Sequence, residues 1–169
     1  KPESILIYIY DPMCSWCYGF RQTWKALKNK LPEALPVVSL LGGLAEDSTD
    51  PMSIEMVDHL ERTWIQINEV CGVVFNHEYW RQDPPPPRTT FIACRAVIAA
   101  EGLAGRGEAF AERLQDAYYR EAKNVWDINI LSDLAADFGF RRDTFFEAID
   151  SEHARGIHHE QRALAERLQ

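Results

Sequence analysis

Two cysteines, Cys14 and Cys17, have the residue type and the spacing that indicate redox chemistry. They follow an apolar run at 4–10, which predicts a central strand buried on both faces, and they precede a segment with helical periodicity from Ser15. At a helix start the first sulfur meets unpaired N–H groups and the positive end of the helix dipole, which favour the thiolate. The second cysteine lies one turn further on, within bonding reach. The pattern predicts Cys14 as nucleophile and Cys17 as resolving thiol.

A Cys-x-x-Cys pair is also typical of one half of a zinc site. Such a site needs four ligands, commonly supplied as two close pairs. Cys71 and Cys94 are far apart in the sequence and form no second pair. We therefore expect no metal site, and we interpret Cys71 and Cys94 as lone, buried, structural thiols, because free cysteine is often buried.

Two carboxylates, Asp11 and Glu3, precede the cysteine motif and could relay a proton to Cys17. An aspartate directly after a strand and before Pro12 is equally typical of a turn. We therefore keep both carboxylates out of the predicted catalytic set.

The composition indicates one globular domain, 1–169. Hydrophobic residues make up 46% and charged residues 26% of the chain, and the formal net charge is −8. The sequence shows no apolar run near the ~20 residues that a membrane helix needs and no basic cluster to neutralise phosphates, so neither a membrane nor nucleic acid is expected as a partner. A cytoplasmic location is favoured, and a periplasmic one stays open for a chain whose leader has been removed.

A strand–helix–strand unit occupies 1–43. After the helix that begins near Ser15, a second short strand follows at 36–41. A connection of this length joins two parallel strands of one sheet. Gly42 and Gly43 then end the second strand as flexible turn residues.

The remaining segment, 44–169, predicts helix after helix and no further strand. The expected helices are 50–71, 91–101, 108–120, 127–138 and one last helix from 143 to near 169. The expected boundary residues are Asp50 and Pro51, Gly72, Thr89 or Thr90, Gly139 and Asp143, with a looser point at Gly156.

Two features of this helical segment are interpreted as solvent-facing. The stretch 73–88 contains Pro84–Pro87 and predicts a loop with a stiff surface spacer. His153, His158 and His159 alternate with small and apolar residues in the last helix and are expected on its solvated face.

Several stretches together resemble a known family. They read "YDPMCSWCYGF", "LLGGL", "TTFIACRAVIAAE", "LQDAYYREAKN" and "LSDLAADFGF". With them the chain resembles the DsbA-like branch of the thioredoxin superfamily, and within it the predicted protein disulfide isomerases that include FrnE-type proteins. The resemblance implies a redox pair at Cys14 and Cys17. It also implies that Ser15 and Trp16, the dipeptide between them, tune the pair or contact substrate.

The resemblance also implies segments that this sequence does not show. Thioredoxin-like proteins end with a β-hairpin and a helix, and a cis-proline loop faces their redox cysteines. A two-stranded sheet is marginal in water. We therefore expect that the C-terminal portion is missing from this chain, or that another copy completes the sheet in a homo-oligomer. The predicted fold is α/β and thioredoxin-like, with a large α-helical insertion and without the C-terminal hairpin and helix.

The predicted function is that of a thiol–disulfide oxidoreductase or protein disulfide isomerase working by dithiol–disulfide exchange. The substrates would be protein or small-molecule disulfides. No bound cofactor is expected, and glutathione or a thioredoxin-type protein would serve as reductant. Two alternatives stay open on the same fold: an isomerase of the glutathione-transferase kappa type, and a non-catalytic binding or chaperone module.

Overall fold

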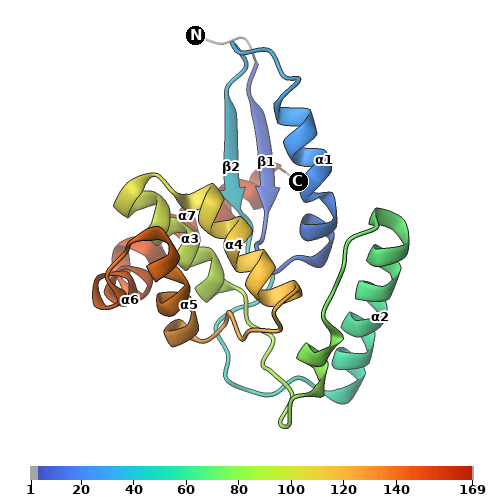
Figure 1. The fold of residues 1–169 in the computed structure, drawn as a ribbon. Helices are drawn as coiled ribbons and strands as arrows, with labels where there is room; N and C mark the ends of the chain where they lie inside the picture. Colours follow the sequence, from blue (N-terminus) through green and yellow to red (C-terminus); the bar gives the residue numbers. More distant parts are fainter. Residues whose placement is uncertain (1–3, 169) are drawn as a thin grey trace.

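The chain combines a small parallel sheet with a large helical body. The computed structural model describes residues 4–168, so Glu3 and Gln169 lie outside the described residues. The elements, seen in Figure 1, are β1 (Leu6–Tyr10), α1 (Ser15–Lys28), β2 (Val37–Leu41), α2 (Ile54–Cys71), a 3-10 helix (His77–Arg81), α3 (Phe91–Ala104), α4 (Gly107–Tyr119), α5 (Ile128–Leu134), a second 3-10 helix (Ala135–Phe138), α6 (Arg142–Asp150) and α7 (Glu152–Leu168). No helix within residues 4–168 has the length and apolar character needed to cross a membrane.

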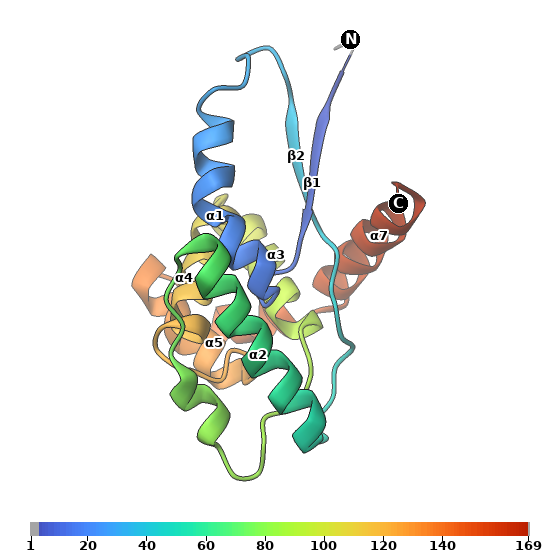
Figure 2. The ribbon, with the colours of Figure 1, turned by 90° about the vertical axis from the view of Figure 1, so that its right-hand side faces the viewer.

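The predicted strand–helix–strand unit is confirmed. β1 and β2 pair in parallel, from Leu6 opposite Val37 to Tyr10 opposite Leu41. Figure 2 shows α1 and α7 on opposite faces of this sheet. On one face the Trp24 ring of α1 stacks on Tyr8 of β1, with 4.1 Å between ring centroids.

The expectation that the first strand is buried on both faces is wrong. The strand begins at Leu6, and all five of its residues are only half-buried. Among residues 4–168, β1 pairs with β2 along one edge and with no strand along the other. An apolar run of this kind is typical of a central strand; here it forms an edge of the described sheet.

The helical body lies at the carboxyl end of both strands, where Figure 1 shows α2 to α6 gathered below the sheet. Its core is an aromatic cluster around Trp64, which is 2% exposed. The Trp64 ring lies 4.9 Å from Phe75, 4.7 Å from Trp80 and 5.4 Å from Tyr119 between centroids. Since each aromatic side chain buries about 150–250 Å², this cluster dominates the packing of α2 against the segments that follow it.

The first long helix starts later than predicted. Asp50 and Pro51 do not cap it; the cap is Ser53, whose side chain accepts a hydrogen bond from the Met56 N–H. Pro51 instead bridges Pro87, and the Met52 N–H donates to the Pro86 carbonyl. The predicted stop at Gly72 is confirmed by its left-handed backbone.

The proline-rich stretch is not the surface spacer that was predicted. Pro86 and Pro87 are buried against the start of α2, while Pro84 is exposed. The preceding loop also contains the 3-10 helix His77–Arg81, which contributes Tyr79 and Trp80 to the core. Pro86 and Pro87 are therefore packed against other parts of the protein and are largely shielded from solvent.

The C-terminal boundaries differ from the prediction in two places. The helix predicted at 127–138 gives way to a 3-10 turn after Leu134 and then ends at Gly139 as expected. The helix predicted from Asp143 onward is two helices, and the break lies at Ser151, not at Gly156. The Ser151 hydroxyl donates to the Ala148 carbonyl and accepts from the Ala154 N–H, so one side chain closes α6 and opens α7.

One histidine expected on a solvated face is buried. His158 is 3% exposed and its ring meets Phe91 of α3 edge-on at 4.9 Å. Gly43 has a left-handed backbone at φ +67, and a Cβ there would come within 2.9 Å of the His158 Nε2 atom. Gly43 is therefore required for close packing and is not merely a flexible turn residue.

His158 makes folding stability sensitive to acid. Burial, followed by the charges of Arg162 and Arg95, lowers the pKa of His158 from 6.5 to about 4. Between pH 6.5 and about pH 4, His158 is protonated in the unfolded chain but stays neutral in the folded chain. The free energy of unfolding therefore decreases as pH falls through this range. We expect His158→Gln to weaken this pH dependence in urea titrations.

The matched control for this measurement is His159→Gln, because His159 is the exposed neighbour on the same helix. It should retain the wild-type slope of stability against pH. Equal slopes in the wild type and in His158→Gln would contradict the assignment.

Candidate redox site

The cysteine motif lies at the connection between β1 and α1, as predicted. Asp11 and Pro12 are buried, and the Cys14 N–H donates to the Asp11 carbonyl at 3.0 Å, which closes a turn. Cys14 is the N-cap of α1, with an extended backbone. The sulfur therefore sits at the positive end of a 14-residue helix.

Backbone and thiol donors converge on the Cys14 sulfur. Its Sγ atom accepts a hydrogen bond from the Cys17 N–H at 3.4 Å. A hydrogen bond from the Cys17 thiol is the largest contribution that lowers the pKa of Cys14 to about 7, and burial opposes it. The same interaction, with burial, raises the pKa of Cys17. Near neutral pH the site can hold one thiolate and one thiol.

The structure brings together the four predicted site residues. Cys14, Ser15 and Cys17 are half-buried, and both cysteines are free thiols. Trp16 is 43% exposed beside them, so its ring is available to a bound molecule. The roles of these residues in catalysis or substrate contact stay predictions.

Tyr18, directly after the motif, fixes α1 in the helical body. Its ring stacks on Tyr119 of α4 at 4.5 Å and its hydroxyl donates to the Val74 carbonyl at 3.1 Å. On the next residue, Gly19, a Cβ would lie 2.8 Å from the Ile67 side chain of α2. The absence of a side chain at Gly19 therefore lets α1 and α2 approach closely, and the motif is held from both sides.

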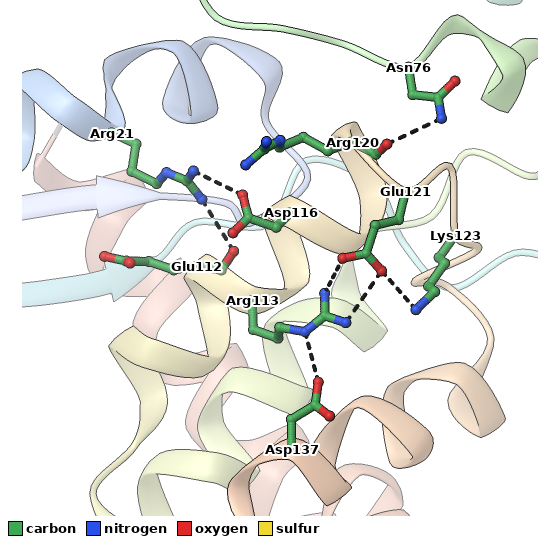
Figure 3. Close-up of polar contacts among 9 residues, drawn as sticks. All are labelled: Arg21, Asn76, Glu112, Arg113, Asp116, Arg120, Glu121, Lys123 and Asp137. Atoms are coloured by element: carbon green, nitrogen blue, oxygen red, sulfur yellow. Dashed lines mark hydrogen bonds and ion pairs between the residues drawn. The ribbon is translucent and has the colours of Figure 1, made fainter.

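Ion pairs join α1 to α4, as Figure 3 shows for Arg21. The Arg21 guanidinium donates to the Asp116 carboxylate at 2.9 Å and to the Glu112 carbonyl at 3.2 Å. One turn along α1, Lys25 pairs with the Glu112 carboxylate at 2.6 Å. The Arg21 side chain is 14% exposed, so its pair is partly shielded from solvent, and together the two pairs hold α1 against α4.

Asp11, kept out of the predicted catalytic set, is buried next to the sulfur pair. It is 2% exposed, and its carboxylate accepts from the Met13 N–H at 2.7 Å and the Leu44 N–H at 2.8 Å. Burial raises the pKa of Asp11, and its charge raises the pKa of Cys17 in turn. The turn role expected from the sequence is real, but the only sequence signal for a buried acid was its place directly after a strand.

The two remaining cysteines differ from each other. Cys94 is buried as predicted, and burial raises its pKa. Cys71 was expected to be buried and is exposed, although it is the last residue of α2 and its side chain lies beside Gly19 of α1. A buried structural role is therefore wrong for Cys71.

Comparisons with known proteins connect this geometry to disulfide chemistry. A Nitrosomonas europaea protein, provisionally described as a protein disulfide isomerase, is 25% identical; the match covers 97% of this chain and 78% of that one with a TM-score of 0.84. The cytosolic disulfide reductase DsbM from Pseudomonas aeruginosa, in a structure with GSH, is 30% identical over 97% of this chain and 80% of its own, with a TM-score of 0.78.

A curated relative carries a different name. The ClpXP adapter protein SpxH of Bacillus subtilis is 26% identical over 157 residues, which are 91% of this chain and 50% of that protein. The chain therefore spans about half the length of the curated relative that it matches. No known family model matches the chain.

The hydrogen bond from Cys17 should control the acidity of Cys14. In Cys17→Ala the thiol donor is gone, so we expect the pKa of Cys14 to rise from about 7 toward its ordinary value. The measurement is the rate of alkylation at Cys14 against pH, followed by mass spectrometry of the Cys14 peptide. Cys71→Ala is the control because it removes an exposed thiol that is not part of the Cys14–Cys17 motif. An unshifted Cys14 titration in Cys17→Ala would show that the helix start alone sets the pKa.

Proposed function

We propose that this chain, which belongs to the DsbA-like thioredoxin-fold family, is a thiol–disulfide oxidoreductase acting through Cys14 and Cys17. The observation that carries the proposal is the Cys14 sulfur at the start of α1, half-exposed and with a pKa lowered to about 7. A sulfur in that state is a nucleophile at neutral pH. The disulfide chemistry named for the solved relatives supports the same conclusion.

The direction that we propose is reduction of disulfides. A nucleophilic cysteine with a strongly lowered pKa stabilises the reduced protein and makes its disulfide a strong oxidant. Among known dithiol proteins a pKa of about 7 is typical of the reductant thioredoxin, and about 3.5 of the oxidant DsbA. The pKa of about 7 for Cys14 favours the reductant end of this range. A reducing, cytoplasmic compartment would keep the pair as dithiol, with glutathione or a thioredoxin-type protein as the electron source.

The reaction has two exchange steps. The Cys14 thiolate attacks one sulfur of the substrate disulfide, which forms a mixed disulfide and releases the first substrate thiolate. Cys17 then loses its proton and attacks the Cys14 sulfur, which releases the second substrate thiolate. Two electrons pass from the dithiol to the substrate, and Cys14 and Cys17 become joined by a disulfide. The raised pKa of Cys17 means that the second step needs a proton acceptor.

Asp11 is the group that we propose as this acceptor. Its carboxyl is buried and its charge acts on both sulfurs. A raised pKa suits a group that must take a proton from a thiol near neutral pH. Its hydrogen bonds to the Met13 and Leu44 N–H groups hold it in place during the reaction.

A second candidate function is that of a protein-binding adapter without redox chemistry. The likeness to a relative named as a ClpXP adapter favours it. A double variant, Cys14→Ser with Cys17→Ser, separates the two functions. A redox role requires both sulfurs, whereas an adapter role would survive their loss and appear as unchanged binding to a protein partner.

Replacement of the two cysteines should have distinct effects. We expect Cys14→Ser to abolish reduction of a model disulfide, because the thiolate is the nucleophile. Cys17→Ser should form the mixed disulfide at Cys14 and fail to release it, which intact-mass measurement will show. Cys71→Ser, which changes an exposed thiol outside the motif, is the matched control and should turn over normally. Full turnover by Cys14→Ser would remove this residue from the mechanism.

Asp11→Asn should slow the second step. The variant retains an oxygen acceptor for one N–H but cannot take up a proton, so we expect release of the mixed disulfide to slow by roughly 100-fold. In the wild type this rate should rise with pH as Asp11 loses its proton, and in the variant that rise should vanish. Asp133→Asn removes an exposed carboxylate of α5 that pairs with Arg142 of α6, and it serves as control. Equal release rates in the wild type and in Asp11→Asn, in rapid-quench experiments, would exclude the acceptor role.

A further inference from the structure

A cavity lies beside the redox cysteine, between the motif and the helical body. Met13 and Ser15, the residues on either side of Cys14, line one wall, and the segment Pro87–Thr89 lines another. Its enclosed volume is about 30 Å³, which is room for one small polar group and far less than a whole ligand needs. The cavity can therefore admit only the end group of a molecule whose remainder lies outside it.

Two hydrogen-bond donors in this cavity lack acceptors. The Trp80 Nε1 atom and the Thr89 Oγ1 atom are buried and have no hydrogen-bond partner within residues 4–168. The two residues are 6% and 3% exposed, and both line the cavity. An indole N–H can only donate, and buried polar groups without partners are unfavourable and rare. The pair can donate to an acceptor that enters this space from outside residues 4–168.

The positive charge of Arg88 beside these donors favours a negatively charged acceptor. Arg88 is exposed, lines the cavity between Pro87 and Thr89, and forms no ion pair with any residue from 4 to 168. Among residues 4–168, no acidic side chain lines this cavity. In a chain with a formal net charge of −8, an unpaired guanidinium next to two free donors is a site for an anion. A guanidinium binds a planar carboxylate through two parallel hydrogen bonds.

The other residues that line the cavity suit an apolar group next to the anion. Met13, Met52 and Leu60 present apolar surface to the cavity. A short aliphatic arm can lie along these side chains, and Ser15 stands where the cavity meets the motif. Trp16 does not line it, so the substrate-contact role expected for the dipeptide falls to Ser15 at this cavity.

We propose that this cavity binds a carboxylate of a low-molecular-weight disulfide and thereby places its sulfur–sulfur bond at Cys14. Arg88 holds the carboxylate, and the Trp80 N–H and the Thr89 hydroxyl donate to its oxygens or to a neighbouring carbonyl. This substrate class rests on the exchange function proposed above. In this reaction the Cys14–Cys17 dithiol gives two electrons and two protons to the bound disulfide, which is reduced to two thiols. Cys14 and Cys17 become joined by a disulfide bond.

The test compares an anionic and a neutral disulfide of small size. The probes are glutathione disulfide and 2-hydroxyethyl disulfide, and the measurement is the rate constant for mixed-disulfide formation at Cys14 in a Cys17→Ser background. In Arg88→Gln we expect the ratio of the anionic to the neutral rate constant to fall roughly tenfold, as loss of a hydrogen bond to a charged group implies. Thr89→Val and Trp80→Phe should lower the same ratio by smaller factors.

Two controls sharpen this result. Arg81→Gln removes an equal charge from the neighbouring 3-10 helix, outside the cavity, and should leave the ratio at its wild-type value. Glutathione disulfide with esterified carboxylates should react with the wild-type background at a lower rate that Arg88→Gln no longer changes. Circular dichroism and thermal melting of each variant verify that it is folded.

Each other outcome overturns a definite statement. If Arg88→Gln leaves the ratio of the anionic to the neutral rate constant unchanged, the cavity holds only water and binds no carboxylate. Equal loss with both probes would assign Arg88 a structural role. If the background protein reacts with neither disulfide while remaining folded, the exchange function itself fails, and that result is distinct from the loss of selectivity.

Discussion

The burial of the Asp11 carboxyl is the constraint on which the rest of this structure depends. A buried carboxyl needs hydrogen-bond donors, because water no longer solvates it. Here the donors come from separate parts of the chain: the Met13 N–H in the same turn and the Leu44 N–H after β2. The Thr90 hydroxyl and the Cys94 thiol at the start of α3 also lower its pKa. The sheet and the helical body therefore meet at Asp11, and Cys14 lies three residues further along the chain.

This junction explains how a small sheet can position a reactive sulfur. The two described strands offer little surface, and β1 is only half-buried. The direction of α1 is set mainly by the helical body, through the stacking of Tyr18 on Tyr119 and the pairing of Arg21 with Asp116. Since the Cys17 thiol and the backbone N–H groups in the first turn of α1 lower the pKa of Cys14, anything that distorts this turn also changes the chemistry of the sulfur.

The features that could be predicted from the sequence are those encoded by neighbouring residues. The Cys14–Cys17 pair, the parallel strands and the stops at Gly72 and Gly139 depend on spacing and on backbone preference within a few residues. The failures depend on distant partners. Asp50 is no helix cap because Pro86 and Pro87 bind the residues after it, and His158 is buried because Phe91 and Gly43 cover it. A hydropathy pattern contains no information on such contacts.

At the candidate site, too, neighbouring residues and distant residues have different roles. The reactivity of Cys14 comes from its own helix and from Cys17, so any chain with this motif between a strand and a helix can have it. What lies beside the sulfur comes from Pro87–Thr89, more than 70 residues away in the sequence, and from the start of α2. If the cavity binds an anion as proposed, substitutions in those segments change the bound molecule without touching the exchange chemistry. The chain is similar to one relative named for disulfide reduction and to another named as an adapter, so similarity alone does not decide what binds beside the sulfurs.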